Sequence, residues 1–490
     1  MSCRIYAALT FVFGLAACGK SFLAKTPESN PTTGNYYTSA VAAENGLTGA
    51  YHDLINGNFY MYDNFMNTDG RSDNCFVNGD NVTAEHPLEN FTLTAANTNV
   101  QRDWQEMYQD ITAANIILDN VPGIDDPVWN GTNRKVQILG EARFLRALAY
   151  YWLVTEWGAC PLILTTTNGG NYYPPRDSVS TVYAQIETDL KFADSVLPVA
   201  PYNGEYGRAT KGAADALLAK TYAQSGDYTD CLSFCNKVIN GGAYSLVPNF
   251  ANLWGLANKN NAESIFEVQF TGTGTPYANW GVELFAYVSS DGWPKRDIGA
   301  WDLVRTFKAA GDTLVRYKTT FNWQIANASF NMPSGAWNAD SVIPFMHKYP
   351  DPSGFNSPDN IVVLRLADII LLAAEANNQL NNTAAAIGEL NQIRSRAGLP
   401  PTTAGTQATL GPAILLERRL ELVDECSRWN DLLRADANGY LNVVDLMNSQ
   451  TDVYGNNLNY NVAADKHQYL FPVPLQDLQL NKNLTQNPGY

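Results

Sequence analysis

The densest group of acidic side chains lies in residues 414–436, ILLERRLELVDECSRWNDLLRAD. Two carboxyl groups held close together are what a glycosidase needs, one as acid and one as nucleophile or base. The candidates for such a pair are Glu417, Glu421, Asp424 and Glu425. The spacing instead favours ion pairs along one helix, because basic partners stand three or four positions away: Arg418 to Glu421, Asp424 to Arg428, and Asp431 to Arg434. We therefore predict structural carboxylates and no catalytic residue.

Other reactive groups form no recognisable site. The sequence has no Gly-rich phosphate loop, no Gly-x-Ser-x-Gly elbow and no His-Glu-x-x-His pair. Cys231 and Cys235 share a helix face, but the four histidines lie far away in sequence, so both cysteines are predicted to be small buried side chains. Residues 351–360 lack the spacing of calcium ligands and predict a surface turn. We expect no cofactor, no metal and no disulfide framework.

Aromatic and polar side chains crowd two segments without helical period, 59–81 and 277–301. The second holds six aromatic residues in 25 positions, twice the average of the chain. Sugars present apolar C–H faces and hydroxyl edges, which flat rings and directed polar groups recognise. The predicted stacking residues are Trp280, Tyr287 and Trp293, with Tyr60 and Tyr62 as lesser candidates, and the predicted hydrogen-bonding residues are Asp69, Arg71 and Asn74. The alternative is that these side chains pack the loops onto the scaffold or face a partner protein.

Amphipathic helices must position these loops. Helical spacing is visible at 40–56, 100–121, 140–157, 178–197 and 414–436, and in two helix pairs at 213–242 and 364–398 that resemble tetratricopeptide units. Residues 57–99 and 243–360 are predicted to be long irregular excursions, with one strand at 263–272. The fold is thus expected to be mostly α, with aromatic-rich loop insertions and minor β structure.

The segment GEARFLRALAYYWLVTEWGACPLIL, residues 140–164, carries two arginines inside an apolar and aromatic helix. Its rings cover much of the helix circumference, which predicts packing between neighbouring helices. Arg143 and Arg146 fall on the remaining side and are predicted to pair with acidic groups of those neighbours. Gly158 and Pro161 end the helix.

The 490-residue chain has a net charge of -16, so a nucleic-acid partner is excluded because phosphates would not be neutralised. The start, MSCRIYAALTFVFGLAACGKS, has one basic residue, Arg4, ahead of an apolar run that is too short to span a bilayer, which indicates an export signal. Leu15-Ala16-Ala17-Cys18 resembles the lipobox of bacterial lipoproteins, in which the cysteine becomes the lipid-bearing first residue. An ordinary secretory signal is the alternative.

Four further stretches resemble the SusD/RagB family of outer-membrane lipoproteins and stand in the order of that family: GEARFLRALAYYWLVTEWGACPLI, VVLRLADIILLAAEANNQL with AIGELNQIRSRAGL, LLERRLELVDECSRWNDLLR, and YLFPVPLQDLQLNKNLTQNPGY. Together with the lipobox they span nearly the whole chain. Asp424 and Cys426 stand where the family usually has an aromatic residue and a glycine, which affects the expected local helix packing.

The resemblance implies a non-enzymatic protein, lipid-anchored through Cys18 and facing the cell exterior, with the membrane contacted through the anchor only. It would bind an oligosaccharide and deliver it to a SusC-like TonB-dependent transporter. A RagB-like peptide-binding protein is the alternative, and a glycoside hydrolase or a pure protein-interaction scaffold is less favoured. The expected layout is a signal peptide at 1–17, a tether at 18–39, and a single SusD-like α-helical domain at 40–490 with ligand loops at 57–99 and 243–360.

Overall fold

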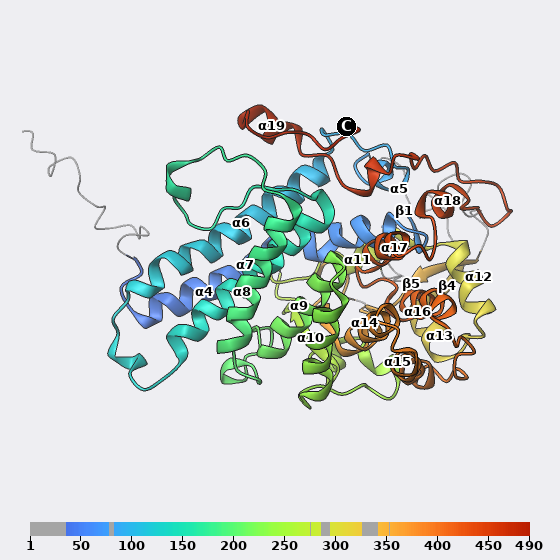
Figure 1. Ribbon diagram of the computed structural model, residues 1–490, viewed down its shortest axis with the longest axis horizontal. Coiled ribbons are helices and arrows are strands. Elements are labelled where there is room, and N and C mark those ends of the chain that lie inside the picture. The colour runs from blue at the N-terminus through green and yellow to red at the C-terminus, as the bar shows by residue number, and fades with distance from the viewer. Residues whose placement is uncertain (1–35, 78–82, 275, 286–294, 326–341, 352) are drawn as a thin grey trace, which may run out of the picture.

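The computed structural model describes residues 36–77, 83–274, 276–285, 295–325, 342–351 and 353–490. These ranges are mainly helical, as predicted, and the long helices pack largely against their neighbours in chain order (Figure 1). The stack consists of α4 (Ala40–Asn56), α6 (Thr98–Asn120), α7 (Arg134–Trp157), α8 (Val179–Val196), α9 (Lys211–Ser225), α10 (Tyr228–Asn240), α14 (Leu366–Gln379), α15 (Thr383–Arg396), α16 (Gln407–Leu422) and α17 (Arg428–Ala437). No helix of the described ranges is both long and apolar enough to cross a membrane.

The α9–α10 pair shows how the sequence sets a helix-turn-helix unit. The Thr210 side chain caps the start of α9, and Gly226, in the left-handed region at φ 84°, ends it. The Asp227 side chain then caps α10. Cys231 and Cys235 are fully buried, as predicted, on a helix that packs against α14.

The predicted pairing of the α7 arginines is confirmed. The guanidinium of Arg146 donates two hydrogen bonds to the carboxylate of Asp189 on α8, at 2.7 and 2.8 Å. Arg143 lies 3.8 Å from the same carboxylate. Close packing of the two helices is possible at Gly140, where a Cβ atom would lie 2.6 Å from Cγ2 of Val196. The α7 rings are buried, as expected for a helix inside the stack.

Within the described residues, two antiparallel sheets interrupt the helices. The predicted strand is β2 (Ser264–Val268), which pairs with β6 (Ile361–Arg365). A four-stranded sheet has the order β1-β3-β5-β4, formed by β1 (Cys75–Val77), β3 (Asp297–Gly299), β5 (Val342–Met346) and β4 (Phe321–Ile325). Its apolar side chains form a second core with α12 (Trp301–Ala309) and α16. The 243–360 section is therefore more regular than predicted, because three of these strands find their partners within it.

The excursion predicted at 57–99 is also partly regular. Phe59–Asp63 and Met66–Gly70 are π-helices, in which the backbone N–H bonds to the carbonyl five residues earlier. Asp63 N–H, for example, donates to the Asn58 carbonyl at 3.1 Å. A π-helix has more residues per turn than an α-helix, so its apolar positions do not show the 3.6-residue period that sequence patterns reveal.

The single helix expected at 414–436 is wrong. The structure has two helices there, and Val423 to Ser427 separate α16 from α17. Asp424 and Cys426 both have positive φ, 60° and 57°, which stops the helical ladder. These are the two positions at which the sequence departs from the pattern of the family that it resembles.

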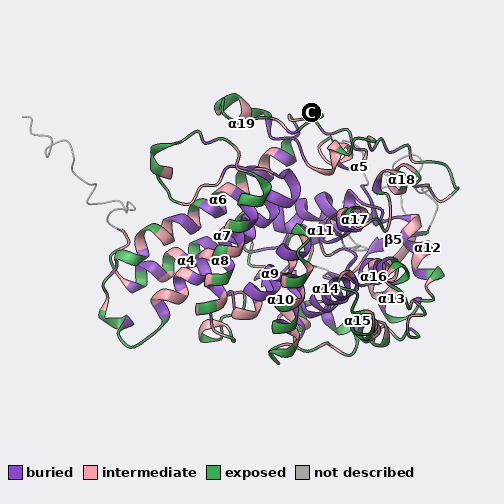
Figure 2. Ribbon diagram, viewed as in Figure 1, coloured by how far each residue is buried: buried purple, intermediate pink, exposed green. Residues whose placement is uncertain are grey.

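The buried core lies in the middle of the molecule, and exposed residues surround it (Figure 2). In Figure 2 buried residues gather in the middle, around α9, α14 and α17, whereas exposed residues line the outer loops and α19. The remaining short helices are α5 (His86–Glu89), α11 (Val282–Phe285), α13 (Val315–Thr320), α18 (Val443–Asn448) and α19 (Leu475–Leu480).

Candidate functional site

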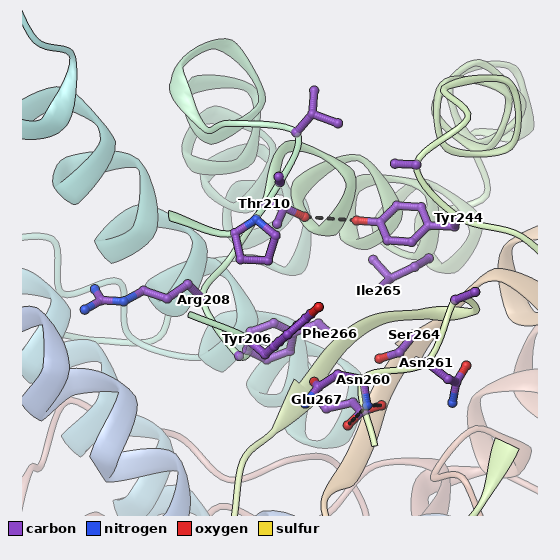
Figure 3. A pocket seen from close by; sticks show the side chains of 16 residues that line it. Tyr206, Arg208, Thr210, Tyr244, Asn260, Asn261, Ser264, Ile265, Phe266 and Glu267 are labelled. Carbon is purple, nitrogen blue, oxygen red and sulfur yellow. Dashed lines mark hydrogen bonds between the residues drawn. The ribbon is translucent and has the colours of Figure 1, made fainter. Parts of the chain in front are cut away.

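Two adjoining hollows form an open groove between the last turns of α4, residues 199–210 and strand β2. Their cavity volumes are about 510 and 300 Å³, which suits small-molecule ligands. The hollows meet at a shared stretch of wall, and Figure 3 shows the larger one. The residues that line both are Tyr206, Gly207, Arg208, Phe266 and Glu267.

Gly207 allows residues 199–210 to lie directly against the sheet. Its φ of 89° is in the region that favours glycine, and a Cβ atom would lie 2.4 Å from Cγ of Gln269. The preceding side chain, Tyr206, stands beside Phe266 in the hollow (Figure 3). The backbone conformation of one glycine thus places an aromatic ring in the groove.

Two tyrosine rings of the groove face solvent. Tyr206 is 63% exposed and Tyr277 is 47% exposed. The Tyr277 ring centroid lies 5.5 Å from that of His52 on α4, with the planes tilted by 41°. Because the rings are neither packed away nor stacked face to face, they offer flat surfaces on which an apolar ligand face can lie.

A hydrogen-bonded polar network holds the wall of the groove in place. The Glu267 carboxylate accepts hydrogen bonds from the Asn260 backbone N–H at 3.0 Å and from the Asn360 amide at 2.7 Å. Gln269 and Asn260 exchange two side-chain hydrogen bonds at 2.8 and 2.9 Å. At the opposite side, the hydroxyls of Thr210 and Tyr244 lie 3.0 Å apart (Figure 3). These bonds preorganise the polar surface before any ligand arrives.

Arg208 is the one Lys or Arg side chain among the described residues that line the groove. It donates to Glu205 at 2.8 Å and lies 3.5 Å from Glu141 and 3.8 Å from Glu44. Burial by itself lowers the pKa of Arg208, but the Glu141 and Glu205 carboxylates outweigh it and raise the pKa above its ordinary value. The guanidinium therefore stays charged and fully paired.

The structure brings together two of the predicted stacking residues but buries one of them. Tyr62 is 4% exposed and its hydroxyl donates to Glu85 at 3.2 Å, while the half-buried Trp280 ring lies 5.5 Å away. Tyr60 is also buried, with 2% exposure. Tyr287 and Trp293 lie outside the described residues. Burial raises the pKa of both Tyr60 and Tyr62, so their hydroxyls stay protonated.

The three predicted hydrogen-bonding residues are buried too and already have partners in the protein. The Asp69 carboxylate accepts from the Asn74 amide at 2.7 Å and from the backbone N–H groups of Asp424 and Cys426 at 3.2 and 3.0 Å. Burial raises the pKa of Asp69 to about 6. The Arg71 guanidinium donates to a backbone carbonyl and lies 4.4 Å from two aromatic ring centroids. Contact with a ligand would require these bonds to be given up.

The sequence patterns did not identify Tyr206, and they counted Tyr277 among the loop aromatics without selecting it. A signal was present, since VAPYNGEYGR at 199–208 places tyrosines in a short Gly- and Pro-containing connection between two predicted helices. An aromatic ring in such a connection does not belong to the apolar face of a helix, so helix packing does not bury it. Exposure, however, depends on what the folded chain leaves uncovered.

The acidic cluster of α16 forms ion pairs, but the predicted partners are partly wrong. Only Asp431 to Arg434, at 2.7 Å, follows the predicted pairing along a helix. Arg418 instead bonds Asp368 and Asp431, and Arg428 bonds Asp73. The glutamates reach cations from other elements: Glu417 with Arg316 and Arg394, Glu421 with Arg316, Arg365 and Arg396, and Glu425 with Lys348 and Arg365. The helix breaks after Leu422, so Arg428 no longer follows Asp424 on one helix.

The remaining acidic groups of the described residues do not assemble into a metal centre. In the part of the chain that the structure describes, no three His, Cys, Asp or Glu side chains are arranged to hold a metal ion. The turn predicted at 351–360 is exposed in its middle, but Asp351 and Asp359 at its ends are buried. Burial raises the pKa of Asp359 to about 7.

Comparison with known proteins covers nearly the whole chain. Residues 21–223 match a family model described as "Starch-binding associating with outer membrane", and residues 260–490 match one described as "SusD family". SusD-like protein P25 of Formosa agariphila is 28% identical over 99% of this chain and 100% of its own length. The starch-binding protein SusD of Bacteroides thetaiotaomicron is 24% identical over 78% of this chain and 77% of its own.

A solved structure described as "Laminarin binding SusD-like protein" has a TM-score of 0.74 and 25% identity. It covers 93% of this chain and all of its own length, so the stack of helices and its inserted sheets are shared as a whole. Because the two family models follow one another along this sequence, with residues 224–259 between them, and the fold agrees over nearly all of it, the chain belongs to the SusD/RagB family.

Proposed function

We propose that this protein captures an oligosaccharide at the cell surface and delivers it to a SusC-like TonB-dependent transporter of the outer membrane. The observation that carries the proposal is the groove in which the exposed rings of Tyr206 and Tyr277 stand beside fixed amide and carboxylate groups. Relatives named as binding starch and laminarin support it. Anchoring through Cys18, which lies outside the described residues, is part of the proposal.

Binding without hydrolysis fits the carboxylates of the groove. Glu267 is buried and accepts hydrogen bonds from Asn260 and Asn360, while Glu205 is paired with Arg208. A glycosidase needs one carboxyl group free to donate a proton and a second free to attack or to activate water. Incubation with a bound glycan is therefore expected to release no new reducing ends. Sustained release of reducing ends would instead identify the protein as a glycoside hydrolase.

Calorimetry of the full-length protein in mild detergent, against a panel of glycans, tests the binding. Tyr206→Ala and Tyr277→Ala are each expected to weaken glycan binding by about tenfold, because each removes a stacking surface. Tyr454→Ala is the matched control, since that ring is 58% exposed but does not line the groove. Tyr206-dependent binding of peptides but of no glycan would favour the peptide-binding alternative.

A further inference from the structure

The described lining of the groove carries more Asp and Glu side chains than Lys and Arg side chains. Glu205 and Glu267 line it, and Arg208 is the one Lys or Arg side chain to balance them. The side chain of Glu205 is 50% exposed, so its charge faces a ligand directly. A ligand in the groove therefore meets a surface of net negative charge.

The cation of the groove is not available to a ligand. Figure 3 shows Arg208 extending away from the other labelled side chains of the hollow. Its guanidinium reaches Glu205, Glu141 and Glu44, as described above, and Glu141 and Glu44 also bind Arg134 at 2.7 and 2.5 Å. The positive charges of Arg134 and Arg208 are therefore fewer than the negative charges of the three glutamates. The net charge of this cluster is negative.

Two lysines that flank lining residues in the sequence, Lys211 and Lys259, are also paired. Lys211, at the start of α9, lies 2.6 Å from Asp194. Lys259 donates to the backbone carbonyls of Phe270 and Pro358, at 2.8 and 2.7 Å. Both ammonium groups thus already have oxygen partners, and neither side chain lines the groove.

The N-terminus of α9, which lies at the groove, is not free to bind an anion. Although α9 begins at the edge of the larger hollow, the Ala213 N–H donates to the Thr210 hydroxyl at 3.2 Å. The Lys211 N–H donates to the Pro198 carbonyl at 2.9 Å. A Cβ atom at Gly212 would lie 2.5 Å from the Tyr244 hydroxyl, so that ring covers the first turn. Groups of the protein itself therefore occupy the positive end of the helix dipole, where an anion would otherwise bind.

We propose that the groove selects uncharged glycans and rejects glycans that carry uronate or sulfate groups. The inference rests on the glycan binding proposed above. Carboxylate and sulfate groups are held in proteins by free Arg, Lys or backbone N–H donors. Here they would instead face Glu205 and Glu267, and like charges brought together oppose binding. Neutral hydroxyls can donate to the same carboxylates and stack their C–H faces on Tyr206.

Matched pairs of oligosaccharides test the selection. The probes are neutral gluco-, manno- and galacto-oligosaccharides and the same chains oxidised to uronates at C6, titrated into the full-length protein in detergent at low ionic strength. At least one neutral chain is expected to bind about tenfold more tightly than its oxidised form. Added salt should narrow the difference, because it screens the repulsion.

Glu205→Gln should also narrow the difference in affinity between the neutral and the oxidised chains. Asp125→Asn should leave that difference unchanged, since Asp125 is an exposed acid outside the groove. Thermal unfolding of both variants verifies that they fold. Tyr206-dependent binding of an oxidised chain as tight as that of its neutral partner overturns the charge selection and leaves glycan capture standing. Binding of neither series in a Tyr206-dependent manner rejects both.

Discussion

Asp297 is a buried acid whose ionisation opposes folding. It lies in β3 beside the Cys75 thiol, and burial, aided by the charge of Asp69, raises its pKa to about 8. An unfolded chain ionises this group near pH 3.9. Between about pH 4 and about pH 8 the folded state therefore holds a proton that the unfolded state lacks, and stability falls as the pH rises.

Asp297→Asn is expected to remove this pH dependence. The neutral amide keeps the shape of the carboxyl group but cannot ionise, so the loss of up to about 1.4 kcal/mol per pH unit disappears for this site. Thermal unfolding measured from about pH 5 to about pH 8 should give a flatter curve for the variant than for the native protein. Asp125→Asn, at an exposed position, is the control. Parallel curves for native protein and Asp297→Asn would show that Asp297 ionises normally in the fold.

Individual site residues were the hardest part to predict from the sequence. A run such as 59–81 shows which rings and polar groups are present but not which of them face inward. Asp69 illustrates the difficulty, because its partners Asp424 and Cys426 lie more than 350 positions away. Tyr206 shows the opposite case, a ring that is exposed and not buried. Its exposure results from packing around Gly207, which no local sequence pattern predicts.

The α7–α8 contact depends on one of its two arginines far more than on the other. The Arg146 side chain is 6% exposed and bonds Asp189, Asn115 and a backbone carbonyl. The Arg143 side chain is 31% exposed, lies 3.8 Å from Asp189, and places its guanidinium 4.1 Å from the centroid of the Phe192 ring. The two positions form a natural pair for comparison, because they share a helix and a carboxylate.

Arg146→Ala is expected to lower the free energy of unfolding by about 3 to 5 kcal/mol, because Asp189 would be left buried without its partner. Arg143→Ala should cost about 1 kcal/mol or less, as for an exposed pair. Chemical denaturation measures both. Neither change should alter glycan affinity of the folded protein, since both residues lie outside the groove lining. Equal losses for the two variants would refute this division.

Elements with a 3.6-residue period were predicted well. The predicted helix at 40–56 coincides with α4, and the helix pairs at 213–242 and 364–398 are α9–α10 and α14–α15. Elements without that period were missed, namely the π-helices and most short strands. A three-residue strand such as β1 exists only because β3, more than 200 positions later, supplies its hydrogen bonds.

The C-terminal segment is an integral part of the molecule rather than a tail. The Trp157 indole donates to the Pro472 carbonyl at 3.1 Å, and Phe471 N–H donates to the Glu156 carbonyl at 2.7 Å. The Asn487 amide donates to the carbonyls of Trp157 and Phe471 at 2.9 and 2.7 Å. The end of α7 is thus closed by residues at the far end of the chain.

Asn487→Ala is expected to lower stability by about 1 to 3 kcal/mol, because it leaves two buried carbonyl groups without their donor. Differential scanning calorimetry measures the shift in melting temperature. Asn483→Ala is the matched control, as that amide bonds an exposed carbonyl of Tyr173. An equal loss of stability in Asn487→Ala and Asn483→Ala would mean that the hydrogen bonds of Asn487 at the end of α7 contribute nothing specific.

Two contacts described above also bear on when the molecule can fold as it is made. Asp69 holds the backbone of Asp424 and Cys426, and Asp73 bonds Arg428, so the first half of the chain is completed by the last. A ribosome adds only about 5 to 20 residues per second, so residues 69 and 73 wait many seconds for their partners. Until then the bonds of Asp69 and Asp73 to the C-terminal part cannot form. Late closure of these contacts would suit the export signal that the sequence predicts at residues 1–17, because a chain passes an export channel unfolded.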